Sequence, residues 1–390
     1  MIAGTDNTNM VERSSEGVTK VMEGVRVLEI AQFTFDLFFT PRNGGHWVIT
    51  GKDAIFAAAT DYATFSNDPV HRFDLPQEFK QFPIHLDPPV HGVFRKVLNE
   101  ILSPRTVSQL DGKIRVLANE LIDAVADKGR CDFAQDIAEP LPVILFMSMM
   151  GLPLDRFAEF REWVLAGVAE GDVQKRQQTW NKVRAMSREL IEQRQQERRD
   201  DIISRLVDTE VEGGRKLTMD EMVSLCLMLF VGGLDTVVNG MSLNIRHLAI
   251  DQDLQARLRA DKSLIPHAVE EILRRYTFTV PVRFVTRDVE FFGAPLKKGD
   301  FVHMFFGSAD LDPRAFPNPE IVDLNRRASH LAFGAGPHRC VGAQLARVEL
   351  KALLEEWLRR IPRFRLDPEK RWVFHTGHVF SIDSLPLLWD

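Results

Sequence analysis

The chain has 390 residues, 45% of them hydrophobic, and a formal net charge of −6 at pH 7. This length and apolar content are ample for one large core or for two domains. The acidic balance argues against a general nucleic-acid-binding protein, which would be basic. Three widely spaced cysteines, Cys131, Cys226 and Cys340, do not form a disulfide framework and fit a reducing compartment, so we expect a cytoplasmic protein.

The N-terminal segment, residues 1–20, is polar at its start and contains no apolar run typical of a signal peptide. We expect it to be flexible. The longest apolar stretches, residues 141–152 and 225–234, are far shorter than the ~20 residues that span a bilayer. The sequence therefore predicts neither a membrane anchor nor a membrane partner.

The first predicted elements are a strand at residues 46–50 and a helix at residues 52–62. A long loop follows at residues 66–89, because five prolines interrupt it. Apolar periodicity then predicts helices at residues 90–102 and 106–128.

Two surface helices are expected at residues 154–169 and 172–206. The charge run at residues 194–201 is interpreted as a solvated helix face. Thr218 and Glu221 form a capping box, with Thr at the N-cap and Glu three residues later. The helix that they open, residues 222–250, is apolar on all sides and should be buried in the middle of the fold.

Three residues in the middle of this apolar segment are energetically unfavourable in a buried helix: the adjacent glycines Gly232 and Gly233 and the acid Asp235. Each glycine costs about 1 kcal/mol relative to Ala, and a buried carboxyl without partners costs more. The following hydroxyl, Thr236, can compete for a carbonyl one turn earlier and loosen the helix. This pattern favours a functional site; the alternative is a kinked core helix with an incidental Asp-Thr pair.

Beyond this helix, Glu271 and Arg274 are i, i+3 neighbours on a further predicted helix. Alone, such a pair is commonly an exposed one worth ~0.2–0.5 kcal/mol. Short alternating runs at residues 288–292 and 300–304 predict small sheets. The expected fold class is therefore mainly α with small β-sheets.

Near the C-terminus, the string from Phe333 to Gly342 reads Phe-Gly-Ala-Gly-Pro-His-Arg-Cys-Val-Gly. Its glycines let the backbone turn tightly against a flat ligand. A single cysteine, Cys340, does not suffice for zinc or an iron–sulfur cluster, but it can be the axial ligand of a haem iron. The alternative is a Gly-rich helix entry with a buried cysteine.

This string resembles the haem-binding loop of the cytochrome P450 family, and the resemblance extends over about residues 45–390. It implies one P450 domain at residues 21–390, with a long central helix over a haem b (iron protoporphyrin IX) ligated by Cys340. The family pattern assigns cofactor contacts to Gly232, Phe333, Gly334, His338, Cys340 and Gly342. It assigns the binding of the haem propionates to His91, Arg95, Arg283 and His338.

The resemblance also implies roles for the two pairs found above. Asp235 and Thr236 match the family's acid–alcohol pair, which supplies protons for the reduction of O₂. Glu271 and Arg274 match its Glu-x-x-Arg pair, with Arg326 or Arg327 as the third member. These latter residues are expected to be structural.

Within the family, the chain is similar to the camphor-hydroxylating bacterial enzymes. Their substrate-orienting tyrosine hydroxyl falls on or near Phe79 here, and the lost hydrogen bond predicts poor use of camphor. We expect a small hydrophobic terpenoid or norisoprenoid, ionone-like rather than camphor. The predicted pocket residues are Phe79, Phe82, Met228, Val231, Thr279, Val280, Val379 and Phe380.

The resemblance implies a [2Fe–2S] ferredoxin as electron donor, itself reduced by an NADH-dependent ferredoxin reductase, since the chain carries no nucleotide fingerprint or Cys-rich cluster of its own. Two alternatives stay open at this point. One is a peroxygenase driven by H₂O₂, although Asp235 and Thr236 argue against it. The other is a non-enzymatic haem-thiolate sensor, for which no regulatory module is visible.

Overall fold

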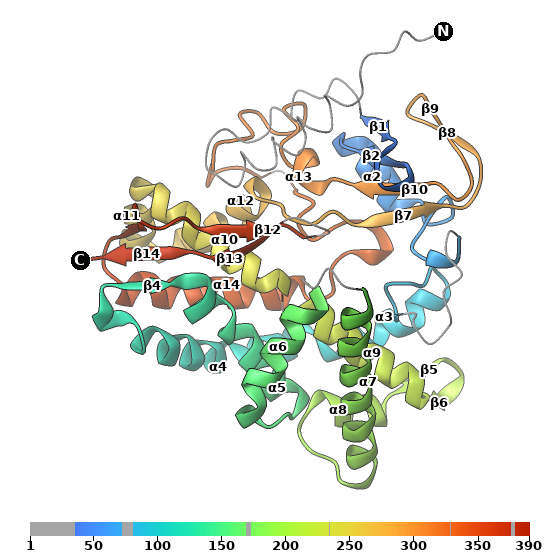
Figure 1. The fold of residues 1–390 in the computed structure, drawn as a ribbon, viewed down its shortest axis with the longest axis horizontal. Coiled ribbons are helices and arrows are strands. Elements are labelled where there is room, and N and C mark those ends of the chain that lie inside the picture. The colour runs from blue at the N-terminus through green and yellow to red at the C-terminus, as the bar shows by residue number, and fades with distance from the viewer. Residues whose placement is uncertain (1–35, 72–80, 169–172, 234, 328, 376–378) are drawn as a thin grey trace. The chain divides into compact units, whose positions relative to one another are not determined.

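The computed structural model describes residues 36–71, 81–168, 173–233, 235–327, 329–375 and 379–390 (Figure 1). The described residues form two compact units. Unit 1 comprises the described residues within 1–75, 270–340 and 376–380, and unit 2 those within 76–269, 341–375 and 381–390. The expected single domain from residue 21 to residue 390 stays a prediction.

Unit 1 is built on a five-stranded sheet in the order β1-β2-β10-β7-β3. The strands are β1 (Leu37–Thr40), β2 (His46–Ile49), β3 (Phe65–Ser66), β7 (Val282–Val285) and β10 (Phe301–Met304). All pairs are antiparallel except the parallel pair of β10 with β2. A separate two-stranded antiparallel hairpin of unit 1 consists of β8 (Val289–Phe291) and β9 (Ala294–Leu296). The strands predicted at residues 46–50, 288–292 and 300–304 are thus confirmed.

The core of unit 1 lies between this sheet and two helices, α2 (Lys52–Thr60) and α13 (Phe306–Ala309). Small and branched side chains from both layers are almost fully buried there, including Ile49, Ile55 and Val302. The helix predicted at residues 52–62 is confirmed as α2. It also contacts the short 3-10 turn Gly336–His338, so it supports the loop that contains Cys340.

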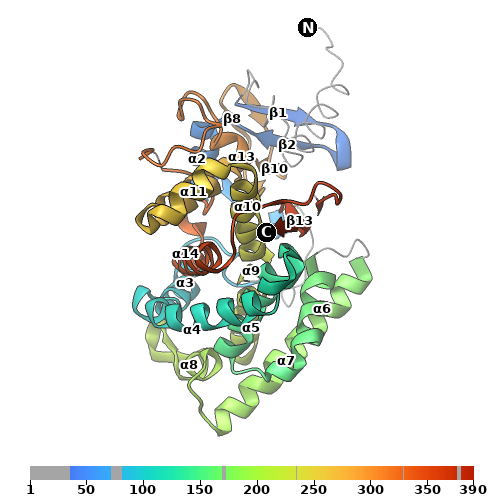
Figure 2. The same ribbon diagram turned by 90° about the vertical axis from the view of Figure 1, so that its left-hand side faces the viewer.

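Unit 2 consists mainly of helices. In chain order they are α3 (Val90–Ile101), α4 (Pro104–Asp123), α5 (Pro140–Met150), α6 (Phe157–Val168), α7 (Val173–Gln196), α8 (Ile202–Asp208), α9 (Met219–Gly233), α10 (Asp235–Ile250), α11 (Gln252–Ala260) and α14 (Ala343–Arg360). The helix α12 (Ile265–Arg275) begins in unit 2 and ends in unit 1. Figures 1 and 2 both show α14 running beside α4, and the two helices pack closely.

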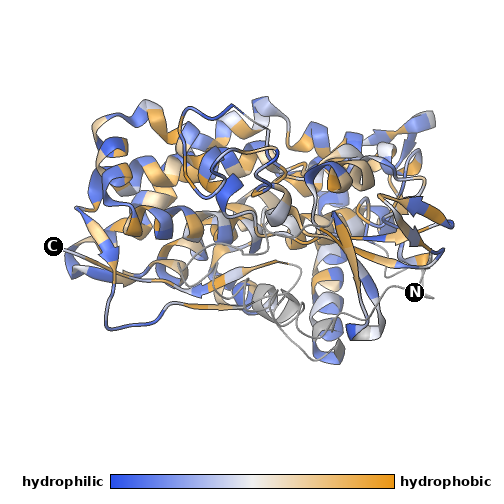
Figure 3. Ribbon diagram, turned by 90° about the horizontal axis from the view of Figure 1, so that it is seen from above, coloured by the Kyte–Doolittle hydropathy of each residue, from blue (hydrophilic) through white to orange (hydrophobic). Residues whose placement is uncertain are grey.

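The sheets of unit 2 are small. The strands β11 (Phe364–Leu366), β14 (Pro386–Trp389) and β4 (Arg130–Asp132) form one of them, β12 (Val373–His375) with β13 (Ser381–Ser384) a second, and β5 (Glu210–Val211) with β6 (Arg215–Lys216) a third. Hydrophobic and hydrophilic residues alternate along the helices (Figure 3), which is the pattern of helices that bury one face. The predicted class, mainly α with small β-sheets, is confirmed.

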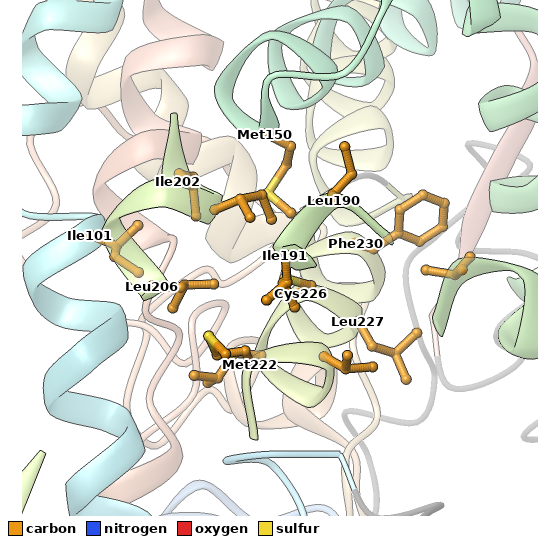
Figure 4. Close-up of a cluster of buried hydrophobic side chains, with 14 of the residues drawn as sticks. Ile101, Met150, Leu190, Ile191, Ile202, Leu206, Met222, Cys226, Leu227 and Phe230 are labelled. Carbon is orange, nitrogen blue, oxygen red and sulfur yellow. The ribbon is translucent and has the colours of Figure 1, made fainter. Parts of the chain in front are cut away.

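The main apolar core of unit 2 collects side chains from several helices (Figure 4). Met222, Cys226 and Phe230 of α9 point into it, and Ile191 of α7 and Ile203 of α8 are fully buried within it. Burial of such side chains stabilises by about 1.5–3 kcal/mol each. This packing fixes α9, and with it the glycines at its C-terminal end.

One predicted helix is wrong. Residues 172–206 form two helices, α7 and α8, because the chain turns between Gln196 and Ile202. The charge run there is more than a solvated face: Arg194 and Asp201 are an almost fully buried ion pair with an Nε–Oδ2 distance of 2.6 Å. Asp201 also caps α8 by accepting a hydrogen bond from the Ser204 amide at 2.8 Å.

Candidate functional site

The Cys340 loop of unit 1 is a tight turn that depends on glycine. Gly334 and Gly336 have φ angles of 71° and 67°, in the left-handed region that disfavours side chains. A Cβ atom at Gly336 would lie 2.3 Å from the backbone oxygen of Ala59 in α2. The loop closes through the Cys340 amide, which donates to the Phe333 carbonyl at 2.8 Å, and Cys340 itself is exposed.

The donor set of this loop fits a haem. The described residues contain no group of three or more His, Cys, Asp or Glu that could hold a metal ion by themselves. Burial raises the pKa of Cys226 to about 12 and also raises the pKa of Cys131, which disfavours thiolate formation at both. A single accessible sulfur is what a haem iron would require of the protein, since the porphyrin supplies four nitrogen ligands of its own.

The pair Glu271 and Arg274 lies in α12 and forms a buried network. The Arg274 guanidinium donates to both Glu271 carboxylate oxygens, at 2.9 and 3.2 Å. Arg326 donates to Glu271 Oε2 at 3.0 Å, whereas Arg327 is exposed. Of the two candidates for the third member, the structure therefore selects Arg326.

In unit 2 the local side-chain hydrogen bonds expected from the sequence are present at both ends of α9. The capping box is confirmed by two hydrogen bonds, from the Thr218 amide to Glu221 at 2.8 Å and from the Glu221 amide to Thr218 Oγ1 at 3.2 Å. At the other end of α9, the Thr236 hydroxyl donates to the Gly232 carbonyl at 2.9 Å, as expected of a hydroxyl that competes for the carbonyl one turn earlier. Residue 234, between α9 and α10, lies outside the described residues.

The space beside the two glycines differs from one to the other. A Cβ atom at Gly232 would meet only the flexible Met228 Cε, at 3.1 Å, and one at Gly233 would meet nothing within 4 Å. Within the described part of unit 2, these glycines therefore leave open space next to the helix rather than permit a tight protein contact. Open space of this kind fits the prediction that a ligand occupies it.

Two partners of Asp235 were missed in the sequence. The Ser381 hydroxyl of β13 lies 3.3 Å from Asp235 Oδ1 and 2.8 Å from Asn239 Oδ1. Asn239 donates in turn to the Asp235 backbone carbonyl at 3.0 Å. The i, i+4 spacing of Asp235 and Asn239 was a usable signal, but Ser381 is distant in sequence and gives none.

The propionate candidates lie in both units. His91 and Arg95 are one turn apart on α3, with His91 buried. Burial lowers the pKa of His91 below its ordinary value, and the Arg95 charge lowers it further while Asp87 opposes the shift. An anion held by both side chains would reverse that effect. In unit 1, Arg283 is buried in β7 and His338 is half-buried in the Cys340 loop.

The pocket candidates divide in the same way. In unit 1, Thr279 pairs with Val379 in an isolated β-bridge, the Phe380 amide donates to the Phe278 carbonyl at 2.9 Å, and Val280 is buried. In unit 2, Met228 and Val231 are half-buried on α9.

The last two pocket candidates are Phe82, which lies among the described residues, and Phe79, which does not. The ring centroid of Phe82 lies 5.0 Å from that of Phe94, a residue of the apolar core, with the two rings tilted, so at least part of the Phe82 ring serves packing. Phe79 and Gly342 stand apart from these groups: Phe79 lies outside the described residues, and Gly342 precedes α14 as its N-cap.

One helical stretch, Met219–Ile250, is long and apolar enough by length and composition to cross a membrane. Its uninterrupted apolar runs, such as residues 225–234, are shorter because polar residues such as Asp235 and Asn239 interrupt it. About half of its most apolar window, 47%, is buried inside the protein, and core helices of soluble proteins meet the same criterion. By itself the stretch is weak evidence for a membrane span.

Comparison with known proteins gives concordant matches. Residues 146–378 match the family model described as Cytochrome P450. The probable cytochrome P450 127A1 of Sinorhizobium fredii is 36% identical over 90% of this chain and 86% of its own length. The steroid C26-monooxygenase of Mycobacterium tuberculosis is 34% identical over 90% and 96%. Among solved structures, that of CYP101J2 has a TM-score of 0.85 and 36% identity, and covers 93% of this chain and 92% of its own.

Proposed function

This chain belongs to the cytochrome P450 family, and we propose that it hydroxylates a small apolar terpenoid of the norisoprenoid type. It is a monooxygenase with the P450 fold, and the family's cofactor is haem b held by a cysteine thiolate. The observation that carries the proposal is the Thr236–Gly232 hydrogen bond of 2.9 Å. Together with the adjacent carboxyl group of Asp235, this hydrogen bond supports an acid–alcohol pair that relays protons at this point of the helix.

Cys340 is the proposed iron ligand. Its support is the glycine-dependent turn, its exposed position and the raised pKa of the other two cysteines. The bound haem supplies the redox iron at which dioxygen is reduced. For Cys340→Ser we expect loss of the red-shifted Soret band of the reduced CO complex and loss of oxygenase activity. An unchanged band would refute the ligand assignment.

Asp235 and Thr236 are the proposed proton donors. A hydroxyl that gives its hydrogen bond to a carbonyl can accept one on its oxygen, so Thr236 can hold a proton donor in place. To pass a proton onward, its own O–H would turn from the Gly232 carbonyl to the next acceptor as its oxygen takes up a proton. Dioxygen reduction without timely protons releases peroxide rather than product. We therefore expect Thr236→Ala to bind haem and substrate but to divert a larger share of NADH to peroxide, and Thr236→Ser to keep the parent's ratio. Equal peroxide per NADH in Thr236→Ala and in the parent would contradict the relay.

The substrate class follows from the side chains proposed to line the pocket. Seven of the eight proposed side chains are apolar and Thr279 carries the one hydroxyl, whereas the position of the camphor enzymes' orienting tyrosine falls on or near Phe79. Apolar walls favour ligands by burial of apolar surface rather than by a specific hydrogen bond. The steroid specificity in the name of the Mycobacterium tuberculosis relative supplies a second class for comparison.

The electron donor proposed is a separate [2Fe–2S] ferredoxin with its NADH-dependent reductase, and the proposed location is the cytoplasm. Members of the family need a redox partner, and this chain contains no nucleotide-binding fingerprint. Turnover with a reconstituted ferredoxin system would support this donor. Turnover with H₂O₂ at the same rate in the absence of reductant would favour a peroxygenase instead.

The substrate is tested by titrating the ferric enzyme with β-ionone, camphor and a cholestane ketone while following the Soret band. Displacement of the iron-bound water shifts the band and reports fit directly. We expect β-ionone to give the largest shift at the lowest concentration. A complete Soret shift at a low concentration of camphor would refute the norisoprenoid proposal. The same result with the cholestane ketone would indicate that the substrate is a steroid.

A further inference from the structure

The carboxyl group of Asp235 lies within hydrogen-bond reach of a serine in unit 2, and an asparagine contacts both that serine and the Asp235 backbone carbonyl. Ser381 begins β13 and is 4% exposed, and Asn239 in α10 is completely buried. Asn239 makes a bridge between the two elements. Its Nδ2 donates to the Asp235 carbonyl at 3.0 Å, and its Oδ1 accepts from the Ile382 amide at 3.0 Å.

These contacts fix which way the Asn239 amide points. The Ile382 N–H can only donate and the Asp235 carbonyl can only accept. A flipped Asn239 would place its NH₂ group against the Ile382 N–H and its oxygen against the Asp235 carbonyl. Asn239 Oδ1 therefore faces β13, where it also receives the Ser381 hydroxyl at 2.8 Å.

Ser381 has one hydroxyl proton and two acceptors in reach. Asn239 Oδ1 is the nearer at 2.8 Å, and Asp235 Oδ1 is at 3.3 Å. When Asp235 is ionised, the Ser381 proton can turn to the carboxylate. When Asp235 is protonated, its own O–H can donate to Ser381 Oγ while the serine proton turns to Asn239. Every donor then has an acceptor in both states.

We propose that Ser381, oriented by Asn239, is a positioning residue that holds the Asp235 side chain in one place whether or not the carboxyl carries a proton. The inference rests on the proposed function, because it matters only if Asp235 delivers protons. A proton donor must lose and regain its proton in each turnover. A partner that hydrogen-bonds both forms removes the need for the side chain to move between them.

The first test is infrared spectroscopy of the resting enzyme over a range of pH. Subtracting the Asp235→Asn spectrum from the parent isolates the carboxylic-acid C=O band of Asp235. We expect this band to shift in Ser381→Ala and to keep its position in Ser381→Thr, which retains a hydroxyl. Ser384→Ala is the matched control, since Ser384 lies in the same strand but donates to Asp132. A band that is unmoved in Ser381→Ala, or is absent from the parent at every pH, would overturn the proposal.

The second test is a double-mutant cycle on the peroxide formed per NADH, with β-ionone and a reconstituted ferredoxin system. For Ser381→Ala we expect this ratio to rise by about tenfold, the lower end of the effect of losing one hydrogen bond to a charged group. The β-ionone concentration that gives half of the Soret shift should stay within about twofold of the parent's value, because Ser381 acts through Asp235 rather than on the substrate. The variant Asp235→Asn/Ser381→Ala should form no more peroxide than Asp235→Asn.

The outcomes distinguish the proposed proton delivery by Asp235 from the proposed positioning role of Ser381. If Asp235→Asn leaves the peroxide ratio unchanged, the proposed proton delivery by Asp235 fails. If Asp235→Asn raises the ratio while Ser381→Ala matches the parent, only the positioning role of Ser381 fails. Additive effects in the double variant would also exclude a role of Ser381 through Asp235.

Discussion

Replacing the buried carboxyl of Asp310 by an amide should stabilise the protein at neutral pH. Asp310 lies in unit 1 and is 0% exposed. Its Oδ2 accepts from the Thr277 hydroxyl at 2.7 Å and its Oδ1 from the Leu331 amide at 2.7 Å. Burial raises its pKa from 3.8 to about 6, although the charge of His330 and these two hydrogen bonds oppose the shift.

The sign of the effect follows from proton binding. Between pH 3.8 and about 6 the folded state keeps a proton on Asp310 that the unfolded state has lost, so stability falls as the pH rises through this window. Above it both states are ionised, and the folded state carries the full cost of the buried charge. At about 1.4 kcal/mol for each pKa unit, that cost is ~3 kcal/mol.

Asparagine fits this position without leaving a polar atom unsatisfied. Its oxygen can accept from Leu331, and its NH₂ group can donate to Thr277, whose own proton then goes to the Leu273 carbonyl at 2.8 Å. We expect Asp310→Asn to be more stable than the parent by up to about 3 kcal/mol at pH 8, with the difference vanishing near pH 4. Asp310→Ala should instead be destabilised by about 1–3 kcal/mol, because the Leu331 amide loses its acceptor.

The assay is urea unfolding of the holoenzyme from pH 4 to pH 8, followed by circular dichroism and by the Soret band. Asp312→Asn is the control with the opposite sign. Burial would raise the pKa of Asp312, but hydrogen bonds from Arg314 hold it below its usual value, so its removal should destabilise at neutral pH. An Asp310→Asn variant whose stability follows that of the parent at every pH would refute the reasoning.

Three further changes test other parts of the structure. Burial raises the pKa of Glu349 on α14 to about 8, so the urea midpoint of the parent should fall between pH 4.5 and pH 8. In Glu349→Gln the fall should end near pH 6, where the contribution of Asp310 ends; equal pH profiles above pH 6 would contradict this. Gly336→Ala combines a φ of 67° with a Cβ only 2.3 Å from a backbone oxygen of α2. It should lower the ratio of Soret to protein absorbance, while Gly213→Ala, with a φ of 83° in open space, should not. Asp201→Ala leaves Arg194 buried without its carboxylate and should cost about 3–5 kcal/mol by urea unfolding; a loss below about 1 kcal/mol would show that the pair is not coupled to folding.

Features set by neighbouring residues could be predicted from the sequence. The Thr218–Glu221 capping box and the competition of Thr236 for the Gly232 carbonyl both involve atoms within one helical turn. Side-chain chemistry and spacing determine such contacts almost alone. The same holds for the Cys340 loop, where only glycine tolerates the left-handed backbone at Gly334 and Gly336.

Contacts between distant segments could not be predicted in this way. Arg326 and Arg327 are adjacent and identical in type, and only the course of the backbone decides that Arg326 reaches Glu271. Likewise, nothing near Arg194 in the sequence indicates that its charge is buried, because its burial depends on the turn that brings Asp201 to it. Ser381 is 146 residues from Asp235, and a single serine in a strand carries no signal of its partner.

The buried charges around Glu271 are best understood from the backbone that they serve. An apolar replacement of a buried ion pair is often as stable as the pair, so the charge itself does not explain the network. Residues 310–327 contain only turns and bends, and their carbonyls therefore lack the partners that a helix or sheet would supply. Arg274 and Arg326 donate to the carbonyls of Asp310, Pro317, Asn318, Pro319 and Ile321. Glu271 accepts hydrogen bonds from both guanidinium groups and aligns them. Because the planar fork of arginine can reach several acceptors at fixed angles and lysine cannot, arginine at these two positions gives an irregular segment a single conformation. That segment leads directly into the loop that presents Cys340.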